Sequence, residues 1–161
     1  MSIKDILNMP INSNFSLTFL VDMGSSKWYY GEEDITNANL GQNFRSKIPR
    51  NELFQINAMI FNVTKHQREI IAQYNCYLDE NSNGLLLILN DSASFSEFTK
   101  EIMMDLFKFC EKVGIKTYEI LISKKHPQYV QLLEELLIVG FKSNEIKNNS
   151  IGESEYIFMK M

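Results

Sequence analysis

The stretch Tyr129–Phe141, "YVQLLEELLIVGF", predicts a helix that ends at a glycine and continues directly into a strand. Its apolar residues recur at the spacing of a helix buried on one side: Tyr129, Leu132, Leu133, Leu136 and Val139. Gly140 follows at the position of a left-handed C-terminal cap, a conformation that glycine adopts without steric cost. Pro127 is expected at the first helical position, where its missing N–H costs nothing.

The bulk composition predicts one globular domain. A chain of 161 residues suits a single core, and 45% hydrophobic with 22% charged residues is ordinary for a folded protein. We expect a short flexible leader at 1–13, broken by Pro10, and one domain at 14–161. The net charge of -4 argues against nucleic acid as the main partner, because phosphate binding favours a basic surface.

Several site classes are not expected. The sequence has no run of eighteen apolar residues and no basic-then-apolar leader, which argues against a membrane span or a secretory signal. Cys76 and Cys110 form no CxxC pattern, and His66 and His126 lie far apart, so we expect no metal site. Cys110 lies within an apolar helical stripe and is interpreted as a small buried thiol.

The first half of the chain is predicted to be mostly extended. Residues 14–23 are rich in Phe, Leu and Val, as in a buried strand, and 27–31 form a second, aromatic extended piece. The polar, Asn-rich segment 32–51 is predicted to be a long surface loop. Residues 52–63 fit helix or strand, with a strand favoured in their second half. Residues 65–74 are predicted to be a short helix with Ile70 and Ile71 facing inward.

The second half alternates strands and helices. "GLLLILN" at 84–90 is predicted to be a strand covered on both faces, and 117–123 is predicted to be another strand. Between them, Ser94 and Glu97 form a capping box before a long helix. Its apolar stripe is Phe95, Phe98, Ile102, Leu106, Phe109 and Val113, followed by Gly114 as cap. With a closing antiparallel pair, the pattern predicts an α+β fold: a mixed, mostly antiparallel sheet with helices packed on it.

This architecture is similar to the N-acetyltransferase (GNAT-like) fold, whose members end in a similar helix-Gly-Phe-strand unit. Acetyl-CoA enzymes of that type need glycines between the central strand and the long helix, where backbone N–H groups bind the pyrophosphate. Here no glycine lies between Leu85 and Val113, and Asp91 adds negative charge. Leu136 stands where those enzymes often have a tyrosine acid. The sequence therefore predicts the fold without its coenzyme site.

A family with that fold and no such loop is the ornithine decarboxylase antizymes, which this chain resembles over about 27–161. The similar stretches, in order, are "KWYYGEEDI", "NSNGLLLILN", "TKEIMMDLFKFCEK", "TYEILISKK", "LLEELLIVGF" and "EYIFMKM". Each is mostly an apolar pattern and unspecific alone. Their order and spacing, together with the missing loop, carry the resemblance.

The resemblance implies a protein that is not an enzyme and needs no cofactor. It would bind the ornithine decarboxylase monomer as a 1:1 heterodimer, prevent homodimerisation and deliver the decarboxylase to the proteasome without ubiquitin. This closes a feedback loop on polyamine synthesis, and synthesis of antizymes depends on a ribosomal frameshift that polyamines stimulate. The implied location is cytoplasmic, or cytoplasmic and nuclear.

The resemblance and the helical wheel together give candidate binding residues on the long helix. Lys100 matches a family lysine that contacts the decarboxylase, and it shares the outer face with Met104, Lys108 and Glu111. Glu101 and Glu111 match family acids that would face basic decarboxylase residues. Lys108 departs from the family pattern by replacing an acid, which requires a compensating change in the partner. The alternative for this face is an ordinary solvated helix surface.

Two further candidates lie outside that helix. Lys124 matches a lysine in the strand-to-helix loop, and its alternative role is solubility alone. Asn144 replaces a family apolar residue, with Ile146 as a substitute two positions later. The aromatic residues 28–30 are expected to be buried against the sheet rather than to form a contact site.

Three function classes remain open from the sequence. The first is the antizyme-like inhibitor and degradation adaptor. The second is a divergent acetyl-CoA-dependent N-acetyltransferase that holds the coenzyme through other backbone groups. The third is a small structural or phage-type domain with a different partner.

Overall fold

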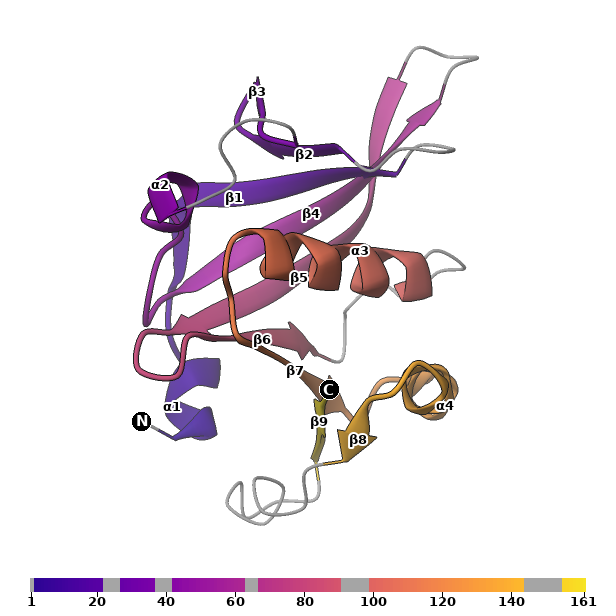
Figure 1. Cartoon of the computed structure of the whole chain (residues 1–161). Helices are drawn as coiled ribbons and strands as arrows, with labels where there is room; N and C mark the ends of the chain where they lie inside the picture. The colour runs from indigo at the N-terminus through magenta and orange to yellow at the C-terminus, as the bar shows by residue number, and fades with distance from the viewer. Residues whose placement is uncertain (1, 22–26, 37–41, 63–66, 91–98, 144–154) are drawn as a thin grey trace.

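The computed structural model describes residues 2–21, 27–36, 42–62, 67–90, 99–143 and 155–161 (Figure 1). They form one sheet of nine strands in the order β3-β2-β1-β4-β5-β6-β7-β9-β8. The strands are β1 Ile11–Val21, β2 Lys27–Tyr30, β3 Glu33–Asp34, β4 Leu53–Asn62, β5 Gln67–Asp79, β6 Gly84–Leu89, β7 Thr117–Ser123, β8 Lys142–Ser143 and β9 Tyr156–Lys160. The helices are α1 Ile3–Leu7, α2 Gln42–Arg45, α3 Thr99–Lys112 and α4 Tyr129–Ile138.

The strand pairing confirms the predicted fold class. The pairs β1–β4 and β6–β7 are parallel, and the other six pairs are antiparallel. The sheet is therefore mixed and mostly antiparallel, as expected. The strands predicted at 14–23, 27–31 and 84–90 correspond to β1, β2 and β6, and 117–123 is β7. Within 52–63, residues Leu53–Asn62 form the strand β4, so the strand includes more than the favoured second half.

The helix predicted at 65–74 is wrong, because residues 67–74 belong to β5. Residues 65 and 66 lie outside the described residues. Ile70 is half exposed, while every second residue further along β5 is buried: Ala72, Tyr74, Cys76 and Leu78. That alternation is the period of a strand with one face on a core. Ten residue pairs bind β5 to β4, and this long-range pairing outweighs the local helical pattern around the two isoleucines.

The second half of the chain forms the unit β6-α3-β7-α4-β8-β9. β6 pairs in parallel with β7 in unbroken register from Gly84 opposite Thr117 to Leu89 opposite Ile122. α3 is the crossover between these two strands, and β9 then inserts between β7 and β8. The closing antiparallel pair predicted from the sequence is confirmed as β8 and β9.

Both glycine caps predicted from the sequence are confirmed. Gly114 follows α3 with φ +80°, and Gly140 follows α4 with φ +107°. In each case the next N–H turns back to the helix: Ile115 donates to the Cys110 carbonyl at 2.9 Å, and Phe141 donates to the Leu136 carbonyl at 3.0 Å.

The start of α4 differs from the prediction, because Pro127 precedes the helix by two residues. The N-terminal cap is Gln128, and the N–H of Gln128 donates to Nδ1 of His126 at 3.1 Å. The N–H of Tyr129 donates to the His126 carbonyl. The helix therefore begins only after a turn at His126, two residues beyond the proline.

Two segments that were expected to be irregular contain defined structure. Residues 1–13 were expected as a loose leader, but they include α1, whose Ser2 side chain accepts from the Asp5 N–H in a capping box, and Ile6 is buried. Segment 32–51, expected as a surface loop, contains β3 and α2. Three of its described apolar residues are buried in the core: Ile35, Phe44 and Ile48. The capping box expected at Ser94 and Glu97 lies outside the described residues.

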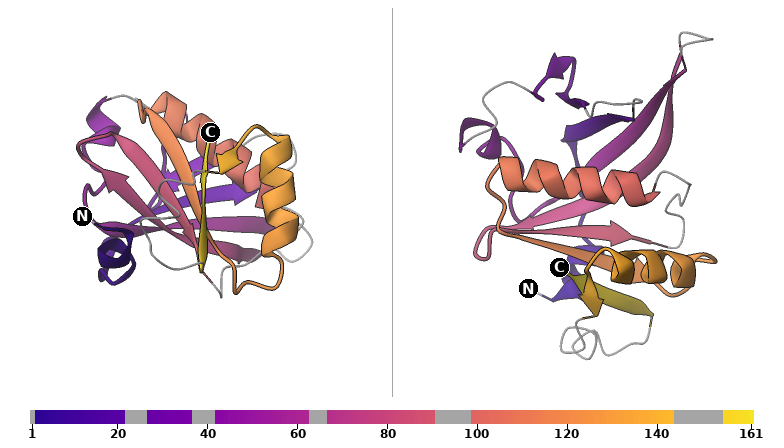
Figure 2. Two further views of the ribbon diagram at one scale, coloured as in Figure 1. Left: turned by 90° about the horizontal axis from the view of Figure 1, so that it is seen from below. Right: turned by 45° about the vertical axis from the view of Figure 1, so that its right-hand side comes forward.

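The sheet separates two apolar clusters of unequal size. α3 and α4 cover one face (Figure 2), where Leu85, Leu87 and Leu89 of β6 join the larger cluster. α1 packs on the opposite face, where Leu86 and Ile88 join the smaller one. All of β6 is buried, which confirms the strand covered on both sides.

Candidate partner-binding surface

The inner face of α3 is fixed by the core. Its buried residues follow helical spacing: Thr99, Ile102, Met103, Leu106, Phe109 and Cys110. The side chains of Thr99 and Tyr74 hydrogen-bond, which joins the first residue of α3 to β5. The orientation of the helix is therefore determined, and the opposite face must point to solvent.

The outer face of α3 carries the residues predicted to bind a partner. Four of them are exposed: Lys100, Glu101, Lys108 and Glu111. Met104, which lies between them along the helix, is half-buried. Lys100, Met104 and Lys108 are four residues apart and thus neighbours along one side of the helix. The structure brings these five residues onto one continuous surface, which we call the α3 outer face. Two positive and two negative side chains there surround one flexible apolar side chain.

An aromatic stack anchors α3 to the first half of the sheet. The Trp28 ring lies between Phe19, at a centroid distance of 5.1 Å, and Phe109, at 4.5 Å. Trp28 Nε1 donates to Asp105 Oδ2 at 3.0 Å. The expected burial of Trp28 is thus confirmed, and Asp105 is a positioning residue that the sequence analysis missed. A buried tryptophan needs an acceptor for its N–H, but nothing local in the sequence says which one.

The two candidates outside α3 are placed differently. Lys124 is exposed in the turn after β7, and its backbone N–H donates to the Glu155 carbonyl at 2.7 Å. Its neighbour Lys125 forms an ion pair with Glu155 at 3.3 Å. Asn144 and Ile146 lie outside the described residues. The structure thus groups five of the candidates on α3 and leaves Lys124 on a separate turn.

The structure describes only part of the region where a coenzyme site was considered. Residues 91–98, between β6 and α3, lie outside the described residues, and segment 90–100 contains no glycine. Leu136, at the position of the tyrosine acid, is buried in the larger cluster. A hydrocarbon side chain in an apolar core can neither donate nor accept a proton.

Three titratable side chains are buried in the larger apolar cluster: Cys76, Cys110 and Tyr118. Burial raises the pKa of the Cys76 and Cys110 thiols, which keeps them protonated and unreactive at neutral pH. Cys110 is buried, as predicted. Burial also raises the pKa of Tyr118, whose hydroxyl donates to Sδ of Met103 at 3.6 Å. These groups belong to the packing of α3 against the sheet.

Two further kinds of feature are absent from the described ranges. None of their helices is long and apolar enough to cross a membrane. They also hold no group of three or more His, Cys, Asp or Glu side chains placed to bind a metal ion.

Comparison with known proteins gives a similarity among solved structures. No protein-family model matches the chain, and no curated protein matches it. Among solved structures, a protein from Bacillus anthracis described as a streptothricin acetyltransferase, in complex with acetyl coenzyme A, is similar at 10% identity with a TM-score of 0.44. The similarity covers 100% of this chain and 93% of that one.

Proposed function

We propose that this chain is a non-catalytic binding protein of the antizyme type, which binds a monomer of ornithine decarboxylase through the α3 outer face. The observation that carries this proposal is the arrangement of that face: Lys100, Glu101, Lys108 and Glu111 around the half-buried Met104. A small apolar centre with a charged rim is the general anatomy of a specific protein interface. The core holds α3 rigidly, so the face is presented without an ordering cost.

The charge pattern supports a partner surface with both signs. Two lysines and two glutamates leave the α3 outer face with no net charge, so specificity must come from the positions of individual charges. Lys100 requires an acid on the decarboxylase, and Glu101 and Glu111 require basic residues. Lys108, which replaces an acid of the antizymes, requires a second acid on the decarboxylase of the same organism.

The proposed outcome of binding is loss of decarboxylase activity. A 1:1 complex that covers the homodimer surface prevents assembly of the active dimer, and the complex then passes to the proteasome without ubiquitin. The protein itself performs no chemistry and needs no cofactor. It acts in the cytoplasm, or in the cytoplasm and nucleus, and limits polyamine synthesis.

The test is a charge reversal with a matched control. Lys100→Glu should weaken decarboxylase binding by about 2 kcal/mol or more, roughly thirtyfold in Kd, if the lysine is paired at a desolvated interface. Lys4→Glu makes the same change on α1, on the opposite face of the sheet, and should leave Kd within twofold. Isothermal titration calorimetry measures both. Equal affinities for the two variants would place the interface away from α3.

The second candidate is a divergent N-acetyltransferase, and one observation favours it. β6 and β7 are adjacent parallel strands joined by α3, and the carboxyl ends of such strands are a common place for ligands in sheets with parallel pairs. Saturable binding of acetyl-CoA by calorimetry, with transfer of the acetyl group to an amine, would establish this function. Inhibition of the decarboxylase at one chain per monomer supports only the first.

A further inference from the structure

The segment 2–9, which contains α1, covers the smaller apolar cluster on the sheet face away from α3. Of these eight residues only Ile6 is buried, and Ile3, Leu7 and Met9 are half-buried against the cluster. The sheet contributes the other buried residues of this cluster: Leu53, Tyr77, Leu86, Ile88, Leu121 and Phe158. A short segment with one buried side chain therefore covers six apolar side chains of the strands.

Within the described part of the chain, no hydrogen bond or ion pair fastens this segment to the sheet. Its hydrogen bonds all join two residues of the segment itself. Ser2 and Asp5 form the capping box. The N–H of Ile6 donates to the Ser2 carbonyl at 3.1 Å, and the N–H of Met9 donates to the Ile6 carbonyl at 3.1 Å. Apolar contacts alone therefore hold α1 on the sheet.

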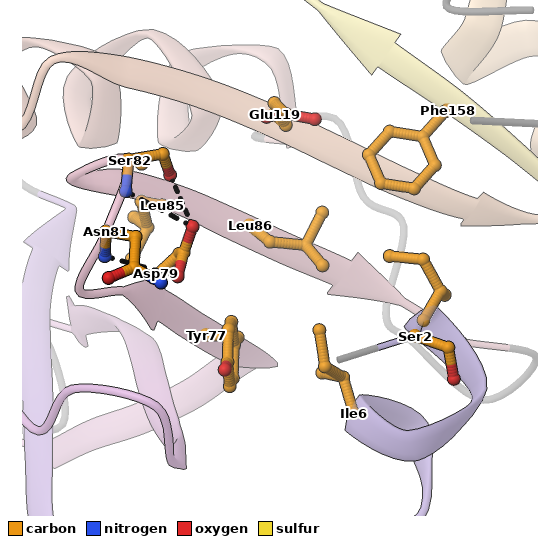
Figure 3. Close-up of a pocket in the computed structure, with 12 residues that line it drawn as sticks. Ser2, Ile6, Tyr77, Asp79, Asn81, Ser82, Leu85, Leu86, Glu119 and Phe158 are labelled. Carbon is orange, nitrogen blue, oxygen red and sulfur yellow. Dashed lines mark hydrogen bonds between the residues drawn. The ribbon is translucent and has the colours of Figure 1, made fainter. Parts of the chain in front are cut away.

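Those apolar contacts are incomplete. A cavity of about 490 Å³ lies between α1 and the strands β5, β6, β7 and β9 (Figure 3). Ser2, Ile3 and Ile6 form part of its wall, and Figure 3 shows Ile6 reaching from α1 toward Leu86. A space of this size between two elements removes dispersion contacts that a close-packed interface would have. The cover is thus more weakly attached than α3 or α4.

The connection from α1 to β1 has the features of a hinge. Pro10 is exposed and has no N–H to contribute to a ladder, and β1 begins after it. The pairing of β1 with β4 shifts register between Ile11 and Ser16 and is regular from Ser16 to Val21. Hinges are a few residues at the ends of elements that absorb a change of backbone angles. A rotation at residues 8–10 therefore moves α1 without disturbing the regular part of β1.

We propose that α1 is a hinged cover, which opens about residues 8–10 and exposes the smaller apolar cluster while the sheet stays folded. Closing the cover orders eight residues but buries one side chain completely and three in part, so the closed state gains little free energy. The strands beneath it are held by their own pairing and by the larger cluster on the other face. The apolar surface under α1 is therefore accessible only in the open state.

The test is thiol labelling at two neighbouring positions of β7. Leu121 and Ile122 are both fully buried, but Leu121 belongs to the smaller cluster and Ile122 to the larger one. Leu121→Cys should react with iodoacetamide about a hundredfold or more faster than Ile122→Cys, because local opening is far more frequent than global unfolding. The native thiols Cys76 and Cys110 lie in the larger cluster and report global unfolding in both variants. Equal rates at all these positions would overturn the proposal.

A second substitution assigns the opening to α1. Ile6→Ala removes most of the one fully buried contact of the cover and should speed the labelling of Leu121→Cys about tenfold or more. Ile70→Ala makes the same change at a half-exposed isoleucine of β5 and should leave the labelling rate unchanged. No gain from Ile6→Ala, or an equal gain from Ile70→Ala, would overturn the assignment to α1.

Hydrogen exchange of the wild-type chain tests the cover without any substitution. An isolated helix of five residues is unstable in water, so opening also releases the amides of Ile6 and Met9. They should exchange about a hundredfold or more faster than the paired amides of β7. Their exchange should change little with urea, because local opening exposes little surface. Equal protection of α1 and β7, with the same dependence on urea, would show that α1 opens only when the whole chain unfolds.

Discussion

The two faces of the sheet differ in how completely they are covered. On one face α3 and α4 pack on a large continuous cluster that reaches from Phe15 to Met159. On the other, a helix of five residues covers a cluster of seven buried residues and leaves a cavity beside it. We infer a division of roles. The first face provides most of the stability and presents the α3 outer face, while the second is closed by a short helix that opens.

The two faces should differ most in how much stability is lost when a buried leucine is shortened to alanine. Leu106→Ala removes a fully buried side chain beneath α3 and should lower the free energy of unfolding by about 3–4 kcal/mol. Leu86→Ala beside the cavity should cost about 2 kcal/mol or less, because that side chain already borders empty space. Urea unfolding followed by circular dichroism measures both. Equal losses would show that the second face is packed as tightly as the first.

The pH dependence of stability above pH 10 tests the burial of Tyr74, which lies in the larger cluster. Burial raises the pKa of Tyr74 to about 12, above the value of 10.0 that the unfolded chain would show. The neutral phenol therefore contributes about 2–3 kcal/mol below pH 10, and this stability is lost as pH rises from 10 to 12. The unfolding free energy of the wild type minus that of Tyr74→Phe should therefore fall by that amount over this range, because the variant has no phenol at this position to ionise.

Tyr77→Phe is the matched variant on the α1 face. The pKa of Tyr77 is also raised, first by burial and then by the charge of Asp79. Its hydroxyl donates to Asn51 Oδ1 at the edge of the cavity. A larger change with pH at Tyr77 than at Tyr74 would contradict the description of the α1 face as the less enclosed one.

The smallest expected effect concerns the anchor between α3 and the first half of the sheet. Trp28→Phe keeps an aromatic ring between Phe19 and Phe109 but removes the N–H that donates to Asp105. The free energy of unfolding should fall by about 1–2 kcal/mol. A double-mutant cycle with Asp105→Ala isolates the interaction. Additive losses in the cycle would show that the hydrogen bond does not stabilise the fold.

The second half of the chain was predictable because its signals are local. β6 is a continuous apolar run, α3 and α4 have helical spacing, and Gly114 and Gly140 end them. β5 was missed because "REIIAQY" has a local pattern that also fits a helix. The alternation from Ala72 to Leu78 was a readable signal of a strand. The parallel pairing of β1 with β4 depends on contacts distant in sequence and could not be foreseen.

The α3 outer face was predictable for the same reason, because helical spacing is a local signal. Helical spacing alone places Lys100, Met104 and Lys108 on one outer side of α3, and the structure agrees. The bond from Trp28 to Asp105 joins residues 77 positions apart, so no local pattern could indicate it. The cavity likewise combines α1 with four strands, so it exists only after folding.

The most direct test of the central proposal is ornithine decarboxylase activity as the purified chain is added to the enzyme of the same organism. The proposal predicts that activity falls to zero with an endpoint near one chain per decarboxylase monomer. Lys100→Glu should shift the inhibition curve to about thirtyfold higher concentration. Full decarboxylase activity at a large excess of the wild-type chain would contradict the proposal, and acetyl-CoA binding would then become the function to test.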